Sequence, residues 1–334
     1  MRSYFAFPLL LLLAFSQPGV AQVATTPIES VEVTSRPIRS FRIGSTDTLF
    51  GPLEFVGGLE ITSPSYIFGA FSSFRFLEPG RRLVGVTDTG MWFFASLVRD
   101  EAFRPLKFTD FTMQPIHDDK GLGHGKWSSD AESIAVRGNM AVVGFERIHR
   151  IVDFEIGDGW AGAPQADVDP LIPRQELRSN RGFETLAFAP QDSEFAGALV
   201  VVSERSLDAA GNVFAAVLDG PRKGIFTVKR SSGYDITDGA FLPNGDLLLL
   251  ERRFTIATGV AMRLRRIIAQ SIVPGGLADG PVLLEADMGY QIDNMEGLDV
   301  WRAPDGALMV SLISDDNRSM FQRNLYLEFR YTGE

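Results

Sequence analysis

Residues 294–317 read NMEGLDVWRAPDGALMVSLISDDN, and this stretch decides the fold. Two short apolar runs flank an Asp-Gly pair, which is a strong signal for the turn of a β-hairpin. Glu296 lies at the start of the first run, and Asp315 and Asp316 follow the second. The stretch therefore predicts one β-hairpin with carboxylates at its open end.

The same pattern recurs along the chain. In each copy a turn glycine precedes an apolar strand, and an acidic residue closes that strand. The closing acids are Asp88, Glu146, Glu204, Glu251 and Asp315. A second series of acids precedes the first strand of each hairpin, namely Glu60, Glu132, Glu184, Asp238 and Glu296. The closing acids are spaced 58, 58, 47 and 64 residues apart and the other series 72, 52, 54 and 58, and a rough period shared by two series indicates a repeat architecture.

Each unit has room for about four short strands, because the stretches between hairpins are also rich in strand-forming residues. Radial repetition of such units is typical of a β-propeller. We expect an all-β, single-domain propeller over residues 22–334, with room for five or six blades and most simply six. The sixth would combine an N-terminal strand near Val31 with the C-terminal strand 325–330, and so close the ring. A β-helix and two stacked sandwiches are the alternative architectures.

The first 21 residues have the composition of a cleaved secretory signal. Arg2 precedes an apolar run from residue 5 to 15, and small residues follow at 19–21. The run is shorter than the roughly 20 residues of a spanning helix, which favours a signal peptide over an uncleaved membrane anchor. We expect a periplasmic or secreted protein with no membrane span in its mature chain.

Charge and cysteine content restrict the possible partners. The formal net charge is −10, so nucleic acid is a poor partner and divalent cations are good ones. The chain has no cysteine, which excludes disulfides, thiolate metal ligands and a cysteine nucleophile. The nucleophile elbow G-x-S-x-G, the zinc motif H-E-x-x-H and the P-loop are also missing. A hydrolase of this sequence is therefore expected to use water activated by a metal.

The hairpin sequences resemble one known family. The motifs that carry the resemblance are DAESIAV (130–136), VVGFERIHRI (142–151), NRGFETLAFAP (180–190), VVVSER (200–205), ITDGAFLPNGDLLLLERRF (236–254) and the opening stretch. Together they are similar to the phytase-like family, or esterase-like activity of phytase, of exported bacterial proteins. The resemblance implies hydrolysis of phosphate or carboxylate esters. Similar propellers such as the alkaline phytases hold calcium in the central channel.

The acids that begin the hairpins would converge at one end of a propeller. Without a counter-ion they would repel one another, and a hard cation such as calcium, with its 6–8 oxygen ligands, would relieve that repulsion. The predicted metal ligands are Glu132, Glu184, Glu296, Glu204, Glu60 and Asp238, of which the first three have the best-matched contexts. Alternatively, each acid binds backbone N–H groups at its own turn and no ring forms. Asp315, Asp316 and Asn317 either add ligands or form an Asx turn.

Three closing acids precede an arginine, and these arginines are Arg147, Arg205 and Arg252. A guanidinium suits phosphate or carboxylate, so we predict that they bind the substrate, unless they form salt bridges between blades. His124, in the Gly-rich segment GLGHGKWSSD, is a further predicted substrate contact, unless that segment is a plain surface loop.

The sequence thus favours an exported, calcium-dependent propeller hydrolase acting on phosphoesters or other esters. A non-catalytic propeller that binds a ligand or protein, with a structural calcium, is the first alternative, and a lactonase-like hydrolase of uncharged esters is the second. The direction of the arginines discriminates between them. At least two of the three facing the central axis would favour phosphate.

Overall fold

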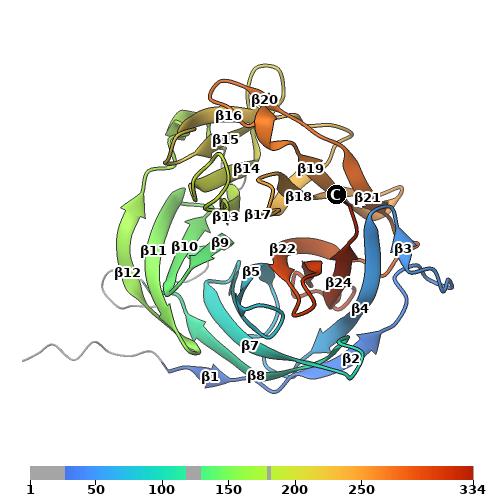
Figure 1. Ribbon diagram of the computed structural model, residues 1–334. Coiled ribbons are helices and arrows are strands. Elements are labelled where there is room, and N and C mark those ends of the chain that lie inside the picture. The colour runs from blue at the N-terminus through green and yellow to red at the C-terminus, as the bar shows by residue number, and fades with distance from the viewer. Residues whose placement is uncertain (1–26, 118–128, 179–181, 334) are drawn as a thin grey trace, which may run out of the picture.

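Five β-sheets surround a central axis, as Figure 1 shows. The computed structural model of the chain describes residues 27–117, 129–178 and 182–333. Within these residues the helices are two 3-10 turns, η1 (Arg174–Glu176) and η2 (Ala269–Ser271). The expectation of an all-β propeller is confirmed, whereas the expectation of six blades is wrong. None of the described helices is long and apolar enough to cross a membrane.

The sheets are numbered as blades 1–5 in chain order, and their strands follow from the axis outward. Blade 1 has β5 (Phe71–Glu78), β6 (Arg82–Thr87), β7 (Met91–Arg99), β8 (Pro105–Pro115) and β1 (Glu29–Ser30). Blade 2 has β9 (Ala131–Arg137), β10 (Met140–Phe145), β11 (Arg150–Gly157) and β12 (Trp160–Val168). Blade 3 has β13 (Phe183–Phe188), β14 (Leu199–Leu207), β15 (Val213–Val217), β16 (Gly224–Val228) and β20 (Leu277–Ala278).

Blade 4 has β17 (Asp235–Phe241), β18 (Leu247–Thr255), β19 (Gly259–Ile267) and β21 (Val282–Ala286). Blade 5 has β22 (Asn294–Arg302), β23 (Leu308–Asp315), β24 (Asn324–Tyr331), β4 (Leu53–Thr62) and β2 (Thr34–Ile38), and β3 (Leu49–Phe50) also pairs with β4. The inner strands β5, β9, β13, β17 and β22 contact one another in this order around the axis.

The ring closes within blade 5 and not through an extra blade. β24 pairs with β23 on one side and with β4 on the other, so hydrogen bonds join the two ends of the chain. Residues 325–330 are thus the third strand of the blade that begins with the 294–317 hairpin. The strand near Val31 is β1, which adds to the outer edge of blade 1. The ring is closed by an N-terminal and a C-terminal strand, as expected, but the N-terminal strand is β4 and not the one near Val31, and the two belong to the fifth blade.

Side chains packed between neighbouring blades form the core. Alternate residues of β18 face different neighbours, as the period of a strand requires. Leu248 and Leu250 pack with residues of blade 5 such as Leu298. Leu247 and Leu249 pack with residues of blade 3 instead. Each leucine is buried, which stabilises the fold by about 1.5–3 kcal/mol per side chain.

Candidate functional site

A β-bulge interrupts each inner strand near its start. One residue of the inner strand is left out of the pairing with the second strand of the blade. Bulges of this kind re-aim a side chain and are common next to functional sites. The residues left out, one per blade, are Ser72, Glu132, Glu184, Thr237 and Glu296. They are equivalent positions at one end of the axis, and three of them are the acids with the best-matched sequence contexts.

The second strand of each blade contributes another equivalent position beside the bulge. On the inner strand, the residue just before the bulge pairs with a residue of the second strand. The position meant here is the next residue along that second strand. These residues are Asp88, Glu146, Glu204, Arg252 and Asp315. Together with the bulge residues they form what we call the acidic end of the propeller. Blade 4 is the exception, because it supplies Thr237 and Arg252 where the other blades supply mostly carboxylates.

The alignment of blade 4 by sequence is therefore one residue out of register. Asp238 follows the bulge residue Thr237, and Glu251 precedes the equivalent position, which Arg252 occupies. Glu251 is buried and pairs with Arg263 and Arg265 inside blade 4. A shift of one residue in a strand moves a side chain to the other face, so neither acid lies where the repeat places it.

Blade 1 also departs from the predicted ring. Its bulge residue is Ser72, whereas Glu60 lies on β4, the fourth strand of blade 5 from the axis. The Glu60 carboxylate lies 3.8 Å from the Arg36 guanidinium. The structure therefore does not bring Glu60 to the acidic end.

Blades 2 and 3 contribute two clusters of carboxylates that could hold a metal ion. In each cluster the oxygen atoms lie within 4.8 Å of one another. The first comprises Asp130, Glu132 and Glu146, and the second comprises Glu146, Glu184 and Glu204. Glu146 belongs to both. Of the predicted metal ligands, the clusters contain Glu132, Glu184 and Glu204. The prediction did not include Asp130 or Glu146.

The sequence does contain a signal for the two missed ligands. Asp130 lies two residues before Glu132, so an extended strand turns both side chains to the same face. Glu146 is a member of the series of closing acids, like Glu204. Treating the two acid series as one site would have included both.

The raised pKa values of the cluster carboxylates reflect their burial and their mutual repulsion. Burial, followed by the charges of Asp130 and Glu204, raises the pKa of Glu146 to about 7. Burial and neighbouring carboxylates also hold the pKa of Glu132 and of Glu184 well above the ordinary value for glutamate. Desolvation and like charges both disfavour the ionised form, and a bound cation would reverse both effects.

Glu184 gives the clearest sign that the clusters fit a cation. Its side chain is buried, at 7% exposed. Within the part of the chain that the structure describes, its carboxylate makes no hydrogen bond or ion pair, and its neighbours are acids. The oxygen atoms of Glu184 are themselves accessible to solvent, so its carboxylate is open to a ligand. Clustered carboxylate oxygens are the donors that calcium prefers, so the residues fit a hard divalent cation.

Blades 4 and 5 form the other side of the acidic end. The Arg252 guanidinium lies 3.3 Å from the Glu296 carboxylate, and Asn294 also donates a hydrogen bond to it at 2.7 Å. Burial raises the pKa of Glu296 to about 7, although Arg252 lowers it. Burial also raises the pKa of Asp315 well above its ordinary value, with Glu296 as the next cause. Glu296 lies outside both metal clusters.

The other two predicted arginines have acidic partners. Arg147 donates a hydrogen bond to Asp130 at 2.5 Å. Arg205 lies 2.7 Å from Asp235 at the start of β17, and so links blade 3 to blade 4. Arg252 is thus the one of the three that contacts an acid of the bulge series.

Two further predictions concern the segments around this end. Asp315 and Asp316 accept hydrogen bonds from the backbone N–H groups of Asn317 and Arg318, which is an Asx-type turn. Asp316 also accepts one from Ala70 and so ties this turn to the segment before β5. His124 lies outside the described residues.

Below the acids, Arg75 of β5 crosses the propeller axis. Its guanidinium lies 2.8 Å from the carboxylate of Asp238 on β17. It also donates hydrogen bonds to the carbonyl oxygens of Leu186, Gly239 and Leu298, which belong to blades 3, 4 and 5. Both charged groups are buried. Asp238 therefore has a partner inside the protein, one residue, or about 3 Å, beyond the bulge.

Further hydrogen bonds to Asp238 fix this ion pair below the acidic end. Asp238 accepts further hydrogen bonds from the Ser73 hydroxyl and from the backbone N–H groups of Gly239 and Leu298. The sequence offers no local signal for this arrangement, because its members are distant along the chain and meet through the ring.

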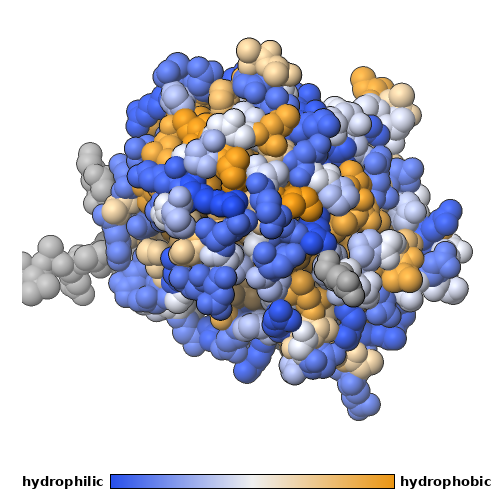
Figure 2. Space-filling model, turned by 45° about the horizontal axis from the view of Figure 1, so that its top comes forward, coloured by the Kyte–Doolittle hydropathy of each residue, from blue (hydrophilic) through white to orange (hydrophobic). Residues whose placement is uncertain are grey.

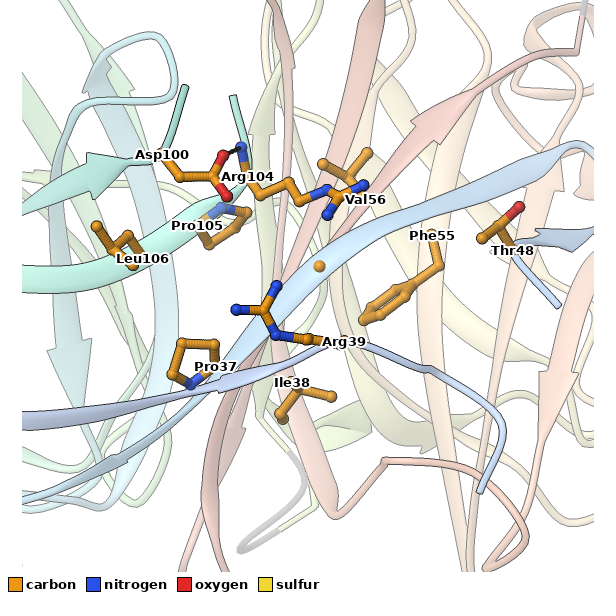
Figure 3. A pocket seen from close by; sticks show the side chains of 11 residues that line it. Pro37, Ile38, Arg39, Thr48, Phe55, Val56, Asp100, Arg104, Pro105 and Leu106 are labelled. Atoms are coloured by element: carbon orange, nitrogen blue, oxygen red, sulfur yellow. Dashed lines mark hydrogen bonds between the residues drawn. The ribbon is translucent and has the colours of Figure 1, made fainter. Parts of the chain in front are cut away.

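The surface away from the acidic end contains other hollows. Figure 3 shows a pocket of about 90 Å³ at the outer junction of blades 5 and 1. Its lining includes Arg39, Phe55 and Arg104, and none of the predicted site residues. Figure 2 shows a largely hydrophilic surface on which hydrophobic residues form small groups.

Comparison with known proteins adds a family to this geometry. A family model described as "Phytase-like: Esterase-like activity of phytase" matches residues 67–318. No curated protein sequence gives a significant match.

Several solved structures are similar at low identity. An endo-arabinase from Bacteroides thetaiotaomicron is 11% identical with a TM-score of 0.47, over 78% of this chain and 94% of that chain. The PQQ-bound aldose sugar dehydrogenase of Streptomyces coelicolor is 12% identical with a TM-score of 0.40, over 91% and 99%. The glutaminyl cyclase of Myxococcus xanthus is 12% identical with a TM-score of 0.41, over 92% and 100%. Similarity at this level carries no argument about activity. The family model spans most of the chain, and on that ground the protein belongs to the Phytase-like family.

Proposed function

We propose that the protein is a metal-dependent hydrolase of ester bonds, with its active site at the acidic end of the propeller. The observation that carries this proposal is the pair of carboxylate clusters that share Glu146. Among the buried members of these clusters, Glu184 makes no hydrogen bond or ion pair with any described residue. Neighbouring buried carboxylates raise one another's pKa, and a bound cation would relieve that repulsion.

Calcium is the cation that we propose for this site. Asp130, Glu132, Glu146, Glu184 and Glu204 would hold it, since they provide the oxygen donors that calcium prefers. A cation of this kind supplies Lewis-acid polarisation of the ester and makes water more acidic. Arg75 and Asp238 lie directly below, so the ligand would approach from the acidic end.

Glu296 is the residue that we propose to accept a proton from the attacking water. A general base works best when its pKa is near the working pH, and the pKa of Glu296 is about 7. In the reaction the water oxygen forms a bond to the carbonyl carbon or phosphorus, and the bond to the leaving oxygen breaks. The proton passes through Glu296 to that oxygen, so the products are an alcohol and an acid.

The arginines bear on the type of ester. Arg147, Arg205 and Arg252 are paired with Asp130, Asp235 and Glu296, so each guanidinium has a carboxylate partner within the protein. The pairings leave phosphoesters, carboxylic esters and lactones as candidate substrates. The assay therefore includes a phosphomonoester, a carboxylic ester and a lactone.

The non-catalytic alternative shares the metal site but lacks turnover. It is favoured by the same clusters, which would then stabilise the fold as a structural calcium site. Turnover, and not calcium binding, separates the two functions. We also propose that the chain is exported, on the strength of its first 21 residues, which lie outside the described part.

The test begins with purified protein from which metal has been removed with a chelator. Hydrolysis of 4-nitrophenyl phosphate, 4-nitrophenyl acetate and a lactone is measured with and without calcium, together with the melting temperature. We expect calcium to raise both the rate on at least one substrate and the melting temperature. Glu184→Gln should abolish both effects, whereas Glu155→Gln, on the exposed face of β11, should leave both unchanged.

Two results would overturn parts of the proposal. No turnover on any ester, with the calcium effect on melting intact, would leave a structural cation and refute the enzyme. No calcium effect on either quantity would refute the metal site itself. Misfolding of Glu184→Gln is recognised separately, because we expect the metal-free variant to melt higher than the metal-free wild type, since it lacks a buried acid with a raised pKa.

A further inference from the structure

One face of β18 runs from the core to the acidic end without interruption. Leu248, Leu250, Arg252 and Phe254 alternate along the strand and therefore lie on the same face. The two leucines pack against blade 5, and Arg252 contacts Glu296 of the same blade. The face of β18 that carries Arg252 and Phe254 is thus the face directed toward blade 5.

β18 extends beyond the position that closes the corresponding strands of three other blades. β6 and β10 end at the residue before this position, and β23 ends at the position itself. β18 continues from Arg252 to Thr255, where the turn to β19 follows. The hairpin of blade 4 therefore projects past the level of the acids.

Arg252 is an exception to the charge of its ring. The equivalent positions in the other blades hold Asp88, Glu146, Glu204 and Asp315. The Nε atom of Arg252 is buried and has no hydrogen-bond partner, so the pairing with Glu296 leaves one donor of the guanidinium unused. An unused buried donor is costly, and an anionic acceptor beside it would remove that cost.

Beyond Arg252 the hairpin presents apolar side chains to solvent. Phe254 is 64% exposed and Ile256 is 98% exposed, and Phe254 lies on the same face of β18 as the buried Leu248 and Leu250, beyond Arg252. Met288, also exposed, lies against the hairpin at Gly259, where a Cβ would approach its Cγ to 2.9 Å. We call Phe254, Ile256 and Met288 the apolar shelf.

We propose that this face of β18 recognises the substrate, with Arg252 binding one anionic group and the apolar shelf binding an aryl or alkyl substituent. The inference rests on the proposed hydrolase function and specifies the class of its substrate. That class is an ester that carries a single phosphate or carboxylate group next to an apolar part. Arg252 precedes the apolar shelf along β18, and the anionic group of the ligand would lie next to its apolar substituent in the same order.

Polyanions are a poor match for the same surface. A second anionic group would lie beside acids that are not among the proposed calcium ligands, such as Asp88 or Asp315, because Arg252 is the guanidinium among the five equivalent positions. Like charges brought together cost free energy, and a protein with a net charge of −10 adds long-range repulsion. We therefore expect one charge per ligand to be favoured over several.

A purely structural role for Arg252 makes different predictions. If Arg252 serves to neutralise Glu296, its removal alters stability and the pKa of Glu296 but does not discriminate between ligands. If it binds the ligand, its removal weakens binding of anions in particular. Binding measurements on inert ligands separate the two roles without reference to turnover.

The experiment is isothermal titration of calcium-loaded protein with phenylphosphonate, methylphosphonate, benzoate and phytate. For the wild type we expect either phenylphosphonate or benzoate to bind at least tenfold more tightly than methylphosphonate. Phytate should bind more weakly than whichever of phenylphosphonate and benzoate binds more tightly. The better of the two identifies the anionic group as phosphate or carboxylate. Arg252→Gln should weaken that ligand at least tenfold, and Arg252→Lys should restore part of the loss.

The aromatic contact has its own variant. Phe254→Ser should weaken phenylphosphonate or benzoate severalfold and leave methylphosphonate unchanged. Two controls leave the shelf intact: Arg302→Gln, at the opposite end of β22, and Phe321→Ser, which is 92% exposed on the β23–β24 loop. Both should bind as the wild type does, and the melting temperature of each variant confirms folding.

The outcomes keep this inference separate from the proposed function. Equal binding by Arg252→Gln and wild type, or tighter binding of phytate than of the single anions, overturns the recognition surface even if ester hydrolysis is observed. Binding that depends on Arg252 and Phe254, in a protein that hydrolyses none of the esters, supports the surface and refutes the hydrolase.

Discussion

Removal of the Arg75 guanidinium should cost more stability than removal of any exposed positive charge. In Arg75→Met, Asp238 remains buried at 0% exposed with its ion pair lost, and carbonyl oxygens on blades 3, 4 and 5 lose a donor. Breaking a buried pair in this way costs about 3–5 kcal/mol. A folded domain has a total stability of about 5–15 kcal/mol, so we expect a large fall in the urea midpoint at pH 7.

A matched control and a second variant give this prediction its specificity. Lys229→Met removes one partner of a pair with Asp279 that is 3.0 Å long and about half exposed, so the cost should lie between 0 and about 1 kcal/mol. Adding Asp238→Asn to Arg75→Met should recover part of the loss, because it removes the uncompensated charge. The reasoning is refuted if Arg75→Met costs no more than Lys229→Met, or if Asp238→Asn lowers the stability of the Arg75 variant further.

Four further predictions concern the acidic end and the closure of the ring. Metal-free protein should lose stability as pH rises from about 4.5 to about 7. Glu146 and Glu296 have raised pKa values, so over this range the folded state binds more protons than the unfolded state. The melting temperature in chelator at pH 5 and pH 8 measures the effect, and equal stability at the two pH values would contradict it. Calcium should stabilise more at pH 8 than at pH 5, since it competes with protons for the same carboxylates. Glu146→Gln should reduce the calcium bound per chain, measured by equilibrium dialysis, more than Glu132→Gln does, because Glu146 belongs to both clusters; equal losses would argue against a shared ligand. Deletion of β24 should abolish cooperative unfolding by leaving β4 without its inner partner, and a sharp transition in the truncated chain would show that the ring is stable without this closure.

Much of the fold could be predicted because its signals are local. The Asp-Gly turn at 305–306 and the alternation of the flanking strands identify a hairpin, and the repeated acids identify copies of it. Turn geometry and strand periodicity depend on residues that are close in sequence. The bulge residues Glu132, Glu184 and Glu296 were singled out for the same reason.

The number of blades could not be predicted by the same means. The spacing of the hairpins allowed five or six units, and the segment 325–330 looked like a strand without a partner. Its partners are β23 and β4, and β4 comes from the other end of the chain. Pairings between distant segments depend on how the whole ring closes, which no local pattern records.

The opening hairpin, residues 294–317, shows where the sequence alone suffices and where it does not. By itself the sequence determined the repeat, the all-β class, and the presence of an acid at the start of inner strands such as β22. Tertiary structure decided which of these acids meet. Bulges set the register, so that Thr237 and Arg252 replace the expected Asp238 and Glu251 in blade 4. The physical reason is that one residue of slip reverses the direction of a strand side chain, and the slip is fixed by packing across the ring.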